Sequence, residues 1–212
     1  MLRFVNVQKS FGVKTVLRNV GAEFTPGAYA LQGPNGCGKS TLLSVLAGII
    51  TPDAGEVFIG GHDLFRAPIK AKTRLAYVPD ESPIYPFMTG REFLQFVAHA
   101  KRCAVAPHAW ALAERFGLGT HLDTRFEAMS LGTQKKTMLV SALIGEPAVV
   151  LMDEPCNGLD SAARAVLALE VTRMRAGAVV LMSTHDAEFV RAMGAALIAF
   201  ESLAAPASLP KP

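Results

Sequence analysis

The sequence contains few cysteines, and their spacing does not suit cross-linking or metal binding. Cys37, Cys103 and Cys156 are odd in number, far apart and without a Cys-x-x-Cys pair. This pattern argues against a disulfide framework and against a zinc site. It is typical of reduced cysteines in a cytoplasmic protein.

Long hydrophobic runs and a strong charge surplus are also missing. The most apolar stretches, Ala148–Met152, Ala176–Met182 and Gly194–Phe200, are far shorter than the roughly 18 residues that indicate a membrane span. Polar residues interrupt the first ten positions, so we expect neither a secretory signal nor a bilayer crossing. The 21 Lys and Arg exceed the 18 Asp and Glu by only three charges, too few to indicate nucleic-acid binding.

The composition is that of a folded domain with a sizeable core. Half of the 212 residues are hydrophobic and 18% are charged. Short β-rich runs alternate with helical patterns, which predicts an α/β fold with a parallel sheet. The predicted strands are Arg3–Val7, Val16–Phe24, Tyr29–Gln32, Glu56–Ile59, Arg74–Val78, Val149–Met152 and Val179–Ser183. The last two are apolar without alternation, which is typical of central strands covered on both faces.

Helical patterns that end at Gly or Pro complete the prediction. They cover Lys39–Ala47, Gly90–Lys101, Pro107–Phe116, Ser130–Ile144, and the stretch from the N-cap Asp160 to near Gly177. No convincing strand occurs between about residues 81 and 146, so we predict a helical subdomain there. Residues 1–80 and 147–202 then form an α/β core, and the Pro-, Ala- and Ser-rich end, 203–212, is predicted to be a flexible tail.

One motif indicates phosphate binding. Gly33, Pro34, Asn35, Gly36, Cys37, Gly38, Lys39 and Ser40 fit the pattern GxxxxGK[ST], directly between an apolar strand and a helix. In such a P-loop, backbone N–H groups and the helix N-terminus surround the phosphates. Lys39 reaches the β and γ oxygens, and Ser40 ligates Mg²⁺.

Two adjacent carboxylates end the predicted strand that begins at Val149. Charges at the carboxyl edge of a parallel strand face the ligand crevice. We therefore expect Asp153 to hold Mg²⁺, usually through water, and Glu154 to act as the general base on the attacking water. The alternative for an isolated acidic pair is an ordinary turn.

With these motifs, the stretch from about Leu2 to Phe200 resembles the nucleotide-binding subunit of an ABC transporter, similar to bacterial exporter subunits. The resemblance implies a P-loop NTPase fold: a RecA-like, mostly parallel sheet with an antiparallel β subdomain, and a helical subdomain carrying the signature motif. It also implies an ATPase with ATP and Mg²⁺ as cofactors. The implied partners are a second nucleotide-binding subunit and membrane permease subunits, which would place the chain on the inner face of the membrane.

Further stretches support the resemblance and extend the implied site. Phe11 stands where the family has an aromatic ring that stacks on adenine, although such a residue is otherwise expected in the core. Thr41 follows the P-loop and is added to the ATP-binding residues. The signature motif LSGGQ corresponds to Met129, Ser130, Leu131, Gly132 and Thr133, which would act on the partner's ATP. Asp160 is the last residue of the stretch 157–160, which resembles the D-loop of the family. His185 follows a strand as the switch histidine does, 32 residues after Asp153, and is expected near the γ-phosphate.

The chain departs from the family at several positions. Asp80 replaces the usual Gln, and either contacts Mg²⁺ or is a solvated turn residue. Lys135 and Lys136 are expected on a solvated helix face. The stripe of Phe93, Phe96, Val97 and Trp110 is expected in the core rather than in a cofactor site. The alternative is that some apolar surface between Tyr77 and Phe96 receives a coupling helix from a membrane subunit. Two other functions stay open: a nucleotide-gated module with little hydrolysis, and a non-transport ABC ATPase.

Overall fold

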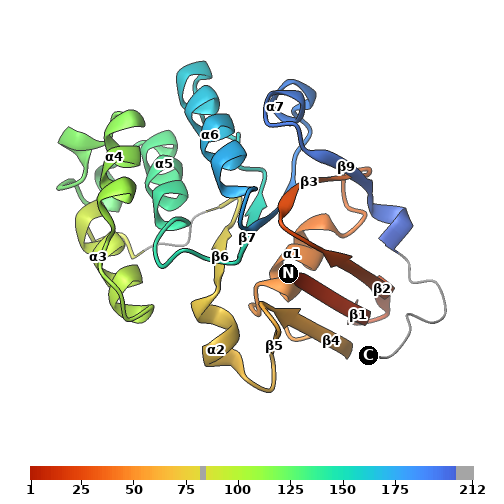
Figure 1. Ribbon diagram of the computed structural model, residues 1–212. Helices are drawn as coiled ribbons and strands as arrows, with labels where there is room; N and C mark the ends of the chain where they lie inside the picture. Colours follow the sequence, from red (N-terminus) through yellow and green to blue (C-terminus); the bar gives the residue numbers. More distant parts are fainter. Residues whose placement is uncertain (82–84, 204–212) are drawn as a thin grey trace.

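The computed structural model describes residues 1–81 and 85–203, which form two sheets and surrounding helices (Figure 1). A parallel sheet has the order β6-β7-β8-β3-β9, and an antiparallel sheet has the order β2-β1-β4-β5. The parallel strands are β3 (Gly27–Gln32), β6 (Leu75–Val78), β7 (Val149–Asp153), β8 (Val179–Ser183) and β9 (Ala196–Ala199). The antiparallel strands are β1 (Leu2–Phe11), β2 (Lys14–Phe24), β4 (Ala54–Ile59) and β5 (His62–Asp63). The predicted fold class is confirmed.

The two predicted central strands, β7 and β8, each pair with a neighbour on both sides, and every residue in them is buried. Successive side chains alternate between two hydrophobic cores, because the side-chain period of a strand is two. Val150 and Met152 pack into the core shared with the helices α3 to α7. Val149 and Leu151 pack into the other core, which the antiparallel sheet and α1 complete.

The helices follow the predicted order, with several short elements that the sequence pattern misses. They are α1 (Lys39–Leu46), α2 (Pro68–Thr73), α3 (Gly90–Ala100), α4 (Pro107–Arg115), α5 (Leu131–Ser141), α6 (Ser161–Met174) and α7 (Ala187–Ala192), with 3₁₀ turns η1 (Gly119–His121), η2 (Phe126–Ala128) and η3 (Phe200–Leu203). α2, α7, β5 and β9 were not predicted, since six residues or fewer are too short to show a periodic pattern.

The helices α3, α4 and α5 gather at the side of the molecule away from the antiparallel sheet (Figure 1). Between residues 85 and 146 of the described chain, the only strand-like pairing is the bridge between Thr89 and Arg125. Phe93, Val97 and Trp110 pack against this core as expected, but Phe96 is 54% exposed and the expectation for it is wrong. Phe96 lies on the face of α3 opposite buried Leu94 and Ala98. The exact bounds of the helical subdomain, 81 and 146, stay predictions.

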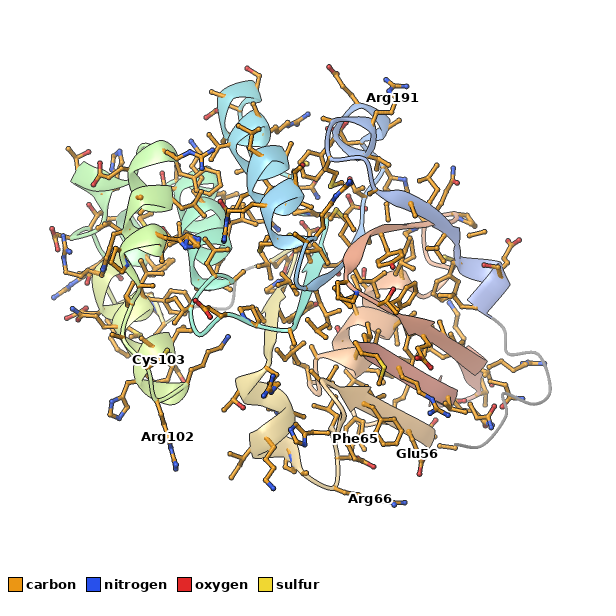
Figure 2. The ribbon with its side chains drawn as sticks, viewed as in Figure 1. Glu56, Phe65, Arg66, Arg102, Cys103 and Arg191 are labelled. Carbon is orange, nitrogen blue, oxygen red and sulfur yellow. The ribbon has the colours of Figure 1, made fainter. Side chains whose placement is uncertain are left out.

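The described chain stays folded one residue further than predicted. Leu203, the predicted first residue of the tail, is the last residue of η3 and is buried in the hydrophobic core that the antiparallel sheet completes. Residues 204–212 lie outside the described residues. Figure 2 shows the side chains on this fold. Arg66 pairs with Glu56 of β4 at 3.4 Å, and exposed Cys103 follows α3 in the helical block.

Candidate functional site

The P-loop connects β3 to α1, where backbone conformation requires glycine. Gly36 and Gly38 have φ values of 76° and 115°, in the left-handed region that other residues rarely adopt. Lys39 opens α1 and is only 7% exposed. Its ammonium donates to the carbonyls of Gly33 at 2.7 Å and Pro34 at 3.1 Å, which holds it across the loop. The loop, the lysine and the helix N-terminus therefore converge on one place suited to an anion.

A serine from the P-loop helix meets the buried carboxylate at the end of β7. The Ser40 hydroxyl donates to Asp153 Oδ1 at 3.1 Å, and the Ser183 hydroxyl donates to the same oxygen. Asp153 is 5% exposed. A hydroxyl and a carboxylate beside a phosphate site are donors of the kind that Mg²⁺ takes together with water and phosphate oxygens. Within the described residues, no group of three or more His, Cys, Asp and Glu could hold a metal alone.

Glu154 and His185 face each other across the ends of β7 and β8. These strands pair in parallel up to Asp153 and Ser183, which brings the next residues to the same edge, as the spacing predicts. His185 Nε2 lies 3.5 Å from Glu154 Oε1. Burial raises the pKa of the Glu154 carboxyl, and His185 opposes part of this shift. Glu154 has a φ of 42°, a strained backbone position of the kind that concentrates at functional sites.

These residues line an open cleft of about 640 Å³, a size that suits a nucleotide. Its lining comprises Phe11, Lys14, Val16, Asn35, Gly36, Gly38, Lys39, Ser40, Thr41, Glu154, Asn157 and His185. Phe11 is 50% exposed at the edge of this cleft, so the alternative that it belongs to the core is wrong. Gly33, Pro34 and Cys37 complete the loop outside the lining. Lys14, Val16 and Asn157 also line the cleft and were not predicted from the sequence, where their only signal is proximity to Phe11 and Asp160.

The signature segment lies at a second hollow rather than in this cleft. Ser130 caps α5 by accepting a hydrogen bond from the backbone N–H of Thr133 at 3.2 Å. Leu131 is 81% exposed and lines the second hollow with Asp80 and Gly158. A Cβ on Gly132 would lie 2.7 Å from the carbonyl oxygen of Gly158, so close packing requires glycine there. The segment therefore presents a capped helix N-terminus outward, away from the chain's own cleft.

Lys135 is buried, which corrects the expectation of a solvated helix face. Its side chain is 4% exposed, and the ammonium donates to three backbone carbonyls, those of Pro79, Asp80 and Asp153. Burial lowers the pKa of Lys135, and the charges of Asp80 and Asp153 oppose the shift. A lysine in a polar stretch gives no sequence signal of such burial. Lys136 stays near the surface and pairs with Asp160 at 2.9 Å.

The carboxylate of Asp80 lies beside Lys135 and not in the lining of the nucleotide cleft. Its Oδ1 accepts a hydrogen bond from the Asn157 amide at 3.0 Å and lies 3.7 Å from the Lys135 ammonium. The side chain is 43% exposed. Contact between Asp80 and Mg²⁺ stays a prediction.

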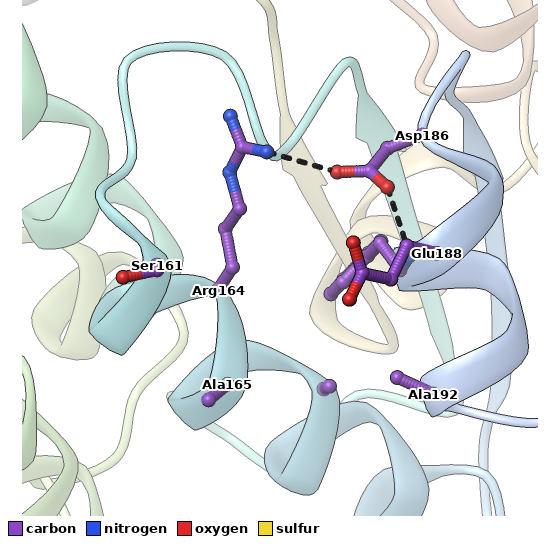
Figure 3. A pocket seen from close by; sticks show the side chains of 8 residues that line it. Ser161, Arg164, Ala165, Asp186, Glu188 and Ala192 are labelled. Carbon is purple, nitrogen blue, oxygen red and sulfur yellow. Dashed lines mark hydrogen bonds and ion pairs between the residues drawn. The ribbon is translucent and has the colours of Figure 1, made fainter.

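An ion pair fixes the segment after His185 to the helix that follows the D-loop. Asp160 caps α6 through the backbone N–H of Ala163 at 2.7 Å, and one turn later Arg164 pairs with Asp186 at 3.1 Å. Asp186 in turn caps α7 (Figure 3). A small hollow of about 240 Å³ lies between α6 and α7. Its lining includes the paired Arg164 and Asp186 together with Ser161, Ala165, Glu188 and Ala192. The loop that carries His185 is thereby anchored on both sides.

Known proteins are similar to this chain in both sequence and fold. The sequence profile of the ABC transporter family matches residues 17–157. Three relatives are the linearmycin resistance ATP-binding protein LnrL of Bacillus subtilis (30% identity, 90% of this chain, 63% of the relative), the Nod factor export ATP-binding protein I of Paraburkholderia xenovorans (35%, 88%, 63%) and the maltose/maltodextrin import ATP-binding protein MalK of Escherichia coli (32%, 85%, 50%). The chain thus spans about half to two thirds of their length.

Solved structures agree with this relationship. The structure of the ATP-binding subunit of an ABC transporter is 29% identical, with a TM-score of 0.80 over 90% of this chain and 81% of that one. A dimeric ATP-binding cassette in a post-hydrolysis state bound to ADP and Pi has the same fold, with 22% identity and a TM-score of 0.80 over 91% of each chain. These matches agree with the P-loop and with the acidic pair at the end of β7. They show that the chain belongs to the ABC transporter family and corresponds to the nucleotide-binding domain of such a transporter.

Proposed function

We propose that this chain binds and hydrolyses ATP, and that two copies, or this chain and a similar subunit, close over two nucleotides to drive a membrane permease. One observation carries the proposal: the signature end of α5 faces outward and is absent from the lining of the chain's own nucleotide cleft. A capped helix N-terminus attracts anions. A second subunit is then needed to bring such an N-terminus to the open side of the cleft.

The residues of the cleft suit in-line attack of water on a γ-phosphate. Lys39 and the P-loop N–H groups hold the phosphates, and Phe11 offers a ring for the base at the cleft edge. Glu154, with its pKa raised by burial, accepts the proton of the attacking water. His185 orients Glu154 at 3.5 Å and faces the γ-phosphate region. The partner's Ser130, Leu131, Gly132 and Thr133 cover the other side and exclude bulk water.

A divalent metal would be held by Ser40 and Asp153, which already meet at 3.1 Å. Mg²⁺ at that position would neutralise charge on the β and γ phosphates. Asp80 is proposed as a third contributor only if it leaves its present partners, Asn157 and Lys135.

An exposed aromatic surface supports a permease partner. Tyr85 and Phe87 are 61% and 63% exposed, their ring centroids lie 5.6 Å apart, and Phe96 on α3 is exposed as well. Exposed aromatic groups of this kind mark interaction sites. We propose that a segment of the permease docks there, which places the chain at the inner face of the membrane. In residues 1–81 and 85–203, no helix combines the length and apolar character that a membrane crossing requires.

Export is the proposed direction of transport. One relative is named for Nod factor export and another for linearmycin resistance, whereas a third is named for maltose/maltodextrin import. A nucleotide-gated subunit with little hydrolysis is the second candidate, favoured by Thr133 and Asp80 at positions where the family has Gln.

Two substitutions at Ser130 that match each other in shape and differ in charge test the composite site. In a Glu154→Gln background, which slows hydrolysis, light scattering at high protein concentration should show an ATP-dependent dimer that ADP does not support. Ser130→Asp keeps an N-cap acceptor but sets a negative charge against the partner's γ-phosphate, so the dimer should be lost. Ser130→Asn is the neutral control and should retain it. A dimer that survives Ser130→Asp, or an equal loss of ATP affinity in the monomer, would contradict the proposal.

A further inference from the structure

Lys135 extends the connection between two strands beyond the point where their backbone pairing stops. β6 and β7 pair in parallel up to Val78 and Met152. Past this point, the Lys135 ammonium donates to Pro79 O at 2.9 Å, Asp80 O at 3.1 Å and Asp153 O at 3.3 Å. All three N–H donors of the ammonium are therefore used, and Lys135 as a whole residue is only 3% exposed.

A buried ammonium needs a nearby negative charge, and Asp80 is the carboxylate in position to supply it. Asp80 Oδ1 lies 3.7 Å from the ammonium and is held there by the Asn157 amide at 3.0 Å. Removing the anion would leave a charge that is expensive to bury. Asn157 also lines the nucleotide cleft, whereas Asp80 does not. The contacts of Asp80 are thus those of a counter-charge.

Lys135 also joins the signature segment to the proposed metal and base residues. It follows the N-cap Ser130 by five residues, about 7.5 Å along α5 at 1.5 Å per residue. Its contact on Asp153 fixes the backbone of the residue whose carboxylate meets Ser40, and Glu154 is the next residue. A displacement of the signature end therefore reaches the ends of both strands through one side chain.

We propose that Lys135 is a positioning residue for hydrolysis, which holds the carboxyl ends of β6 and β7 in place for Asp153 and Glu154 and takes Asp80 as its counter-charge. This inference rests on the proposed function of the cleft. Asp80, which replaces the usual Gln of the family, then balances the charge of Lys135 and does not act as a metal ligand.

Lys135→Met tests the inference, because methionine approximates the volume and removes the charge and the donors. ATP affinity measured without metal should stay within about twofold, since Lys135 does not line the cleft. The concentration of Mg²⁺ that half-maximally tightens ATP binding should rise, and kcat should fall by about tenfold to a hundredfold, as expected for lost hydrogen bonds to a charged group. Lys135→Arg, which keeps charge and donors, should recover part of both effects.

Lys101→Met is the matched control. The ammonium of Lys101, which is partly buried, likewise donates to a backbone carbonyl, that of Ile144 at 2.8 Å. Lys101 follows α3 and is absent from the lining of the cleft. This variant should lose stability without changing the Mg²⁺ dependence. If it changes that dependence as much as Lys135→Met does, a general loss of stability explains both and the inference is overturned.

Asp80→Asn separates the counter-charge from a metal ligand. As a counter-charge, Asp80 matters only through Lys135, so Asp80→Asn should add little to Lys135→Met in the double variant. If Asp80→Asn raises the Mg²⁺ requirement further in the Lys135→Met background, Asp80 acts on the metal independently of Lys135 and the inference is wrong. The binding measurement needs neither turnover nor a dimer, so failure of the proposed function, seen as no hydrolysis or no dimer in the reference protein, is distinguishable from failure of this inference.

Discussion

At the scale of single residues, the site consists of groups whose ordinary properties are changed by position. Lys39 is nearly buried and held by the carbonyls of its own loop, and Asp153 is buried between two serine hydroxyls. Glu154 combines a left-handed backbone with a raised carboxyl pKa. Such burial of charge and backbone strain cost stability and concentrate at functional sites.

Lys39→Ala should lose about tenfold to a hundredfold in ATP affinity, because a donor and a positive charge at the β and γ phosphates disappear. Lys70→Ala on exposed α2 removes the same charge from the surface and should bind ATP as the unmodified chain does. Calorimetric titration of both variants with ATP checks this. Equal affinities in the two variants would remove Lys39 from the site.

The residues with a fixed motif were predictable, and the others were not. The P-loop and the acidic pair are identified from short patterns because their chemistry fixes both residue type and spacing. The burial of Lys135 has no such pattern, since it depends on where α5 crosses the ends of β6 and β7. Exposure of Phe11 likewise depends on its position at the end of β1, beside the nucleotide cleft, which periodicity alone does not reveal.

At the scale of elements, capping decides where the helices begin. Thr89 accepts from the backbone N–H of Glu92, and Glu92 accepts from that of Thr89, which forms a capping box at the start of α3. Ser130, Asp160 and Asp186 cap α5, α6 and α7 through one side-chain bond each. The predicted starts of α3, α5 and α6 were correct to within one residue because these caps are local in the sequence. α7 was missed despite its cap, because its six residues show no period.

Thr89→Ala should lower the free energy of unfolding by about 1 kcal/mol at neutral pH, the usual effect of losing an N-cap. Hydrogen bonds from Thr89 hold the pKa of Glu92 below its ordinary value of 4.5. A lowered folded-state pKa gives stability above the ordinary value that is lost as the pH falls through the folded-state value. The difference between the variant and the unmodified chain should therefore shrink below about pH 4.5, as measured by urea unfolding at several pH values. A difference independent of pH would show that the hydrogen bond from the Thr89 hydroxyl does not lower the pKa of Glu92, whose hydrogen bond from the backbone N–H of residue 89 remains in the variant.

At the scale of the whole molecule, two cores meet at one parallel sheet whose carboxyl edge carries the site. The helical block is joined to the rest by a shared hydrophobic core and by polar contacts. One polar contact is that of Lys135 with the ends of β6 and β7. Another involves buried Glu170 on α6, whose carboxylate lies 2.6 Å from Arg173 on the same helix. The same carboxylate lies 3.8 Å from Arg115 and 3.5 Å from His108, both on α4. The central position of β7 and β8 in the parallel sheet was predictable from their apolar runs. The placement of the helical block was not, because it depends on such long-range contacts.

Release of phosphate from Mg²⁺·ATP is the most direct test of the account. The unmodified chain should hydrolyse ATP, and Glu154→Gln should bind ATP with unchanged affinity while its turnover drops by about 10²- to 10⁴-fold, the usual contribution of a positioned general base. Glu188→Gln, an exposed carboxylate on α7, controls for the loss of a charge and should retain full turnover. Equal rates of phosphate release from Glu154→Gln and the unmodified chain would contradict the assignment of the base and, with it, the proposed hydrolytic site.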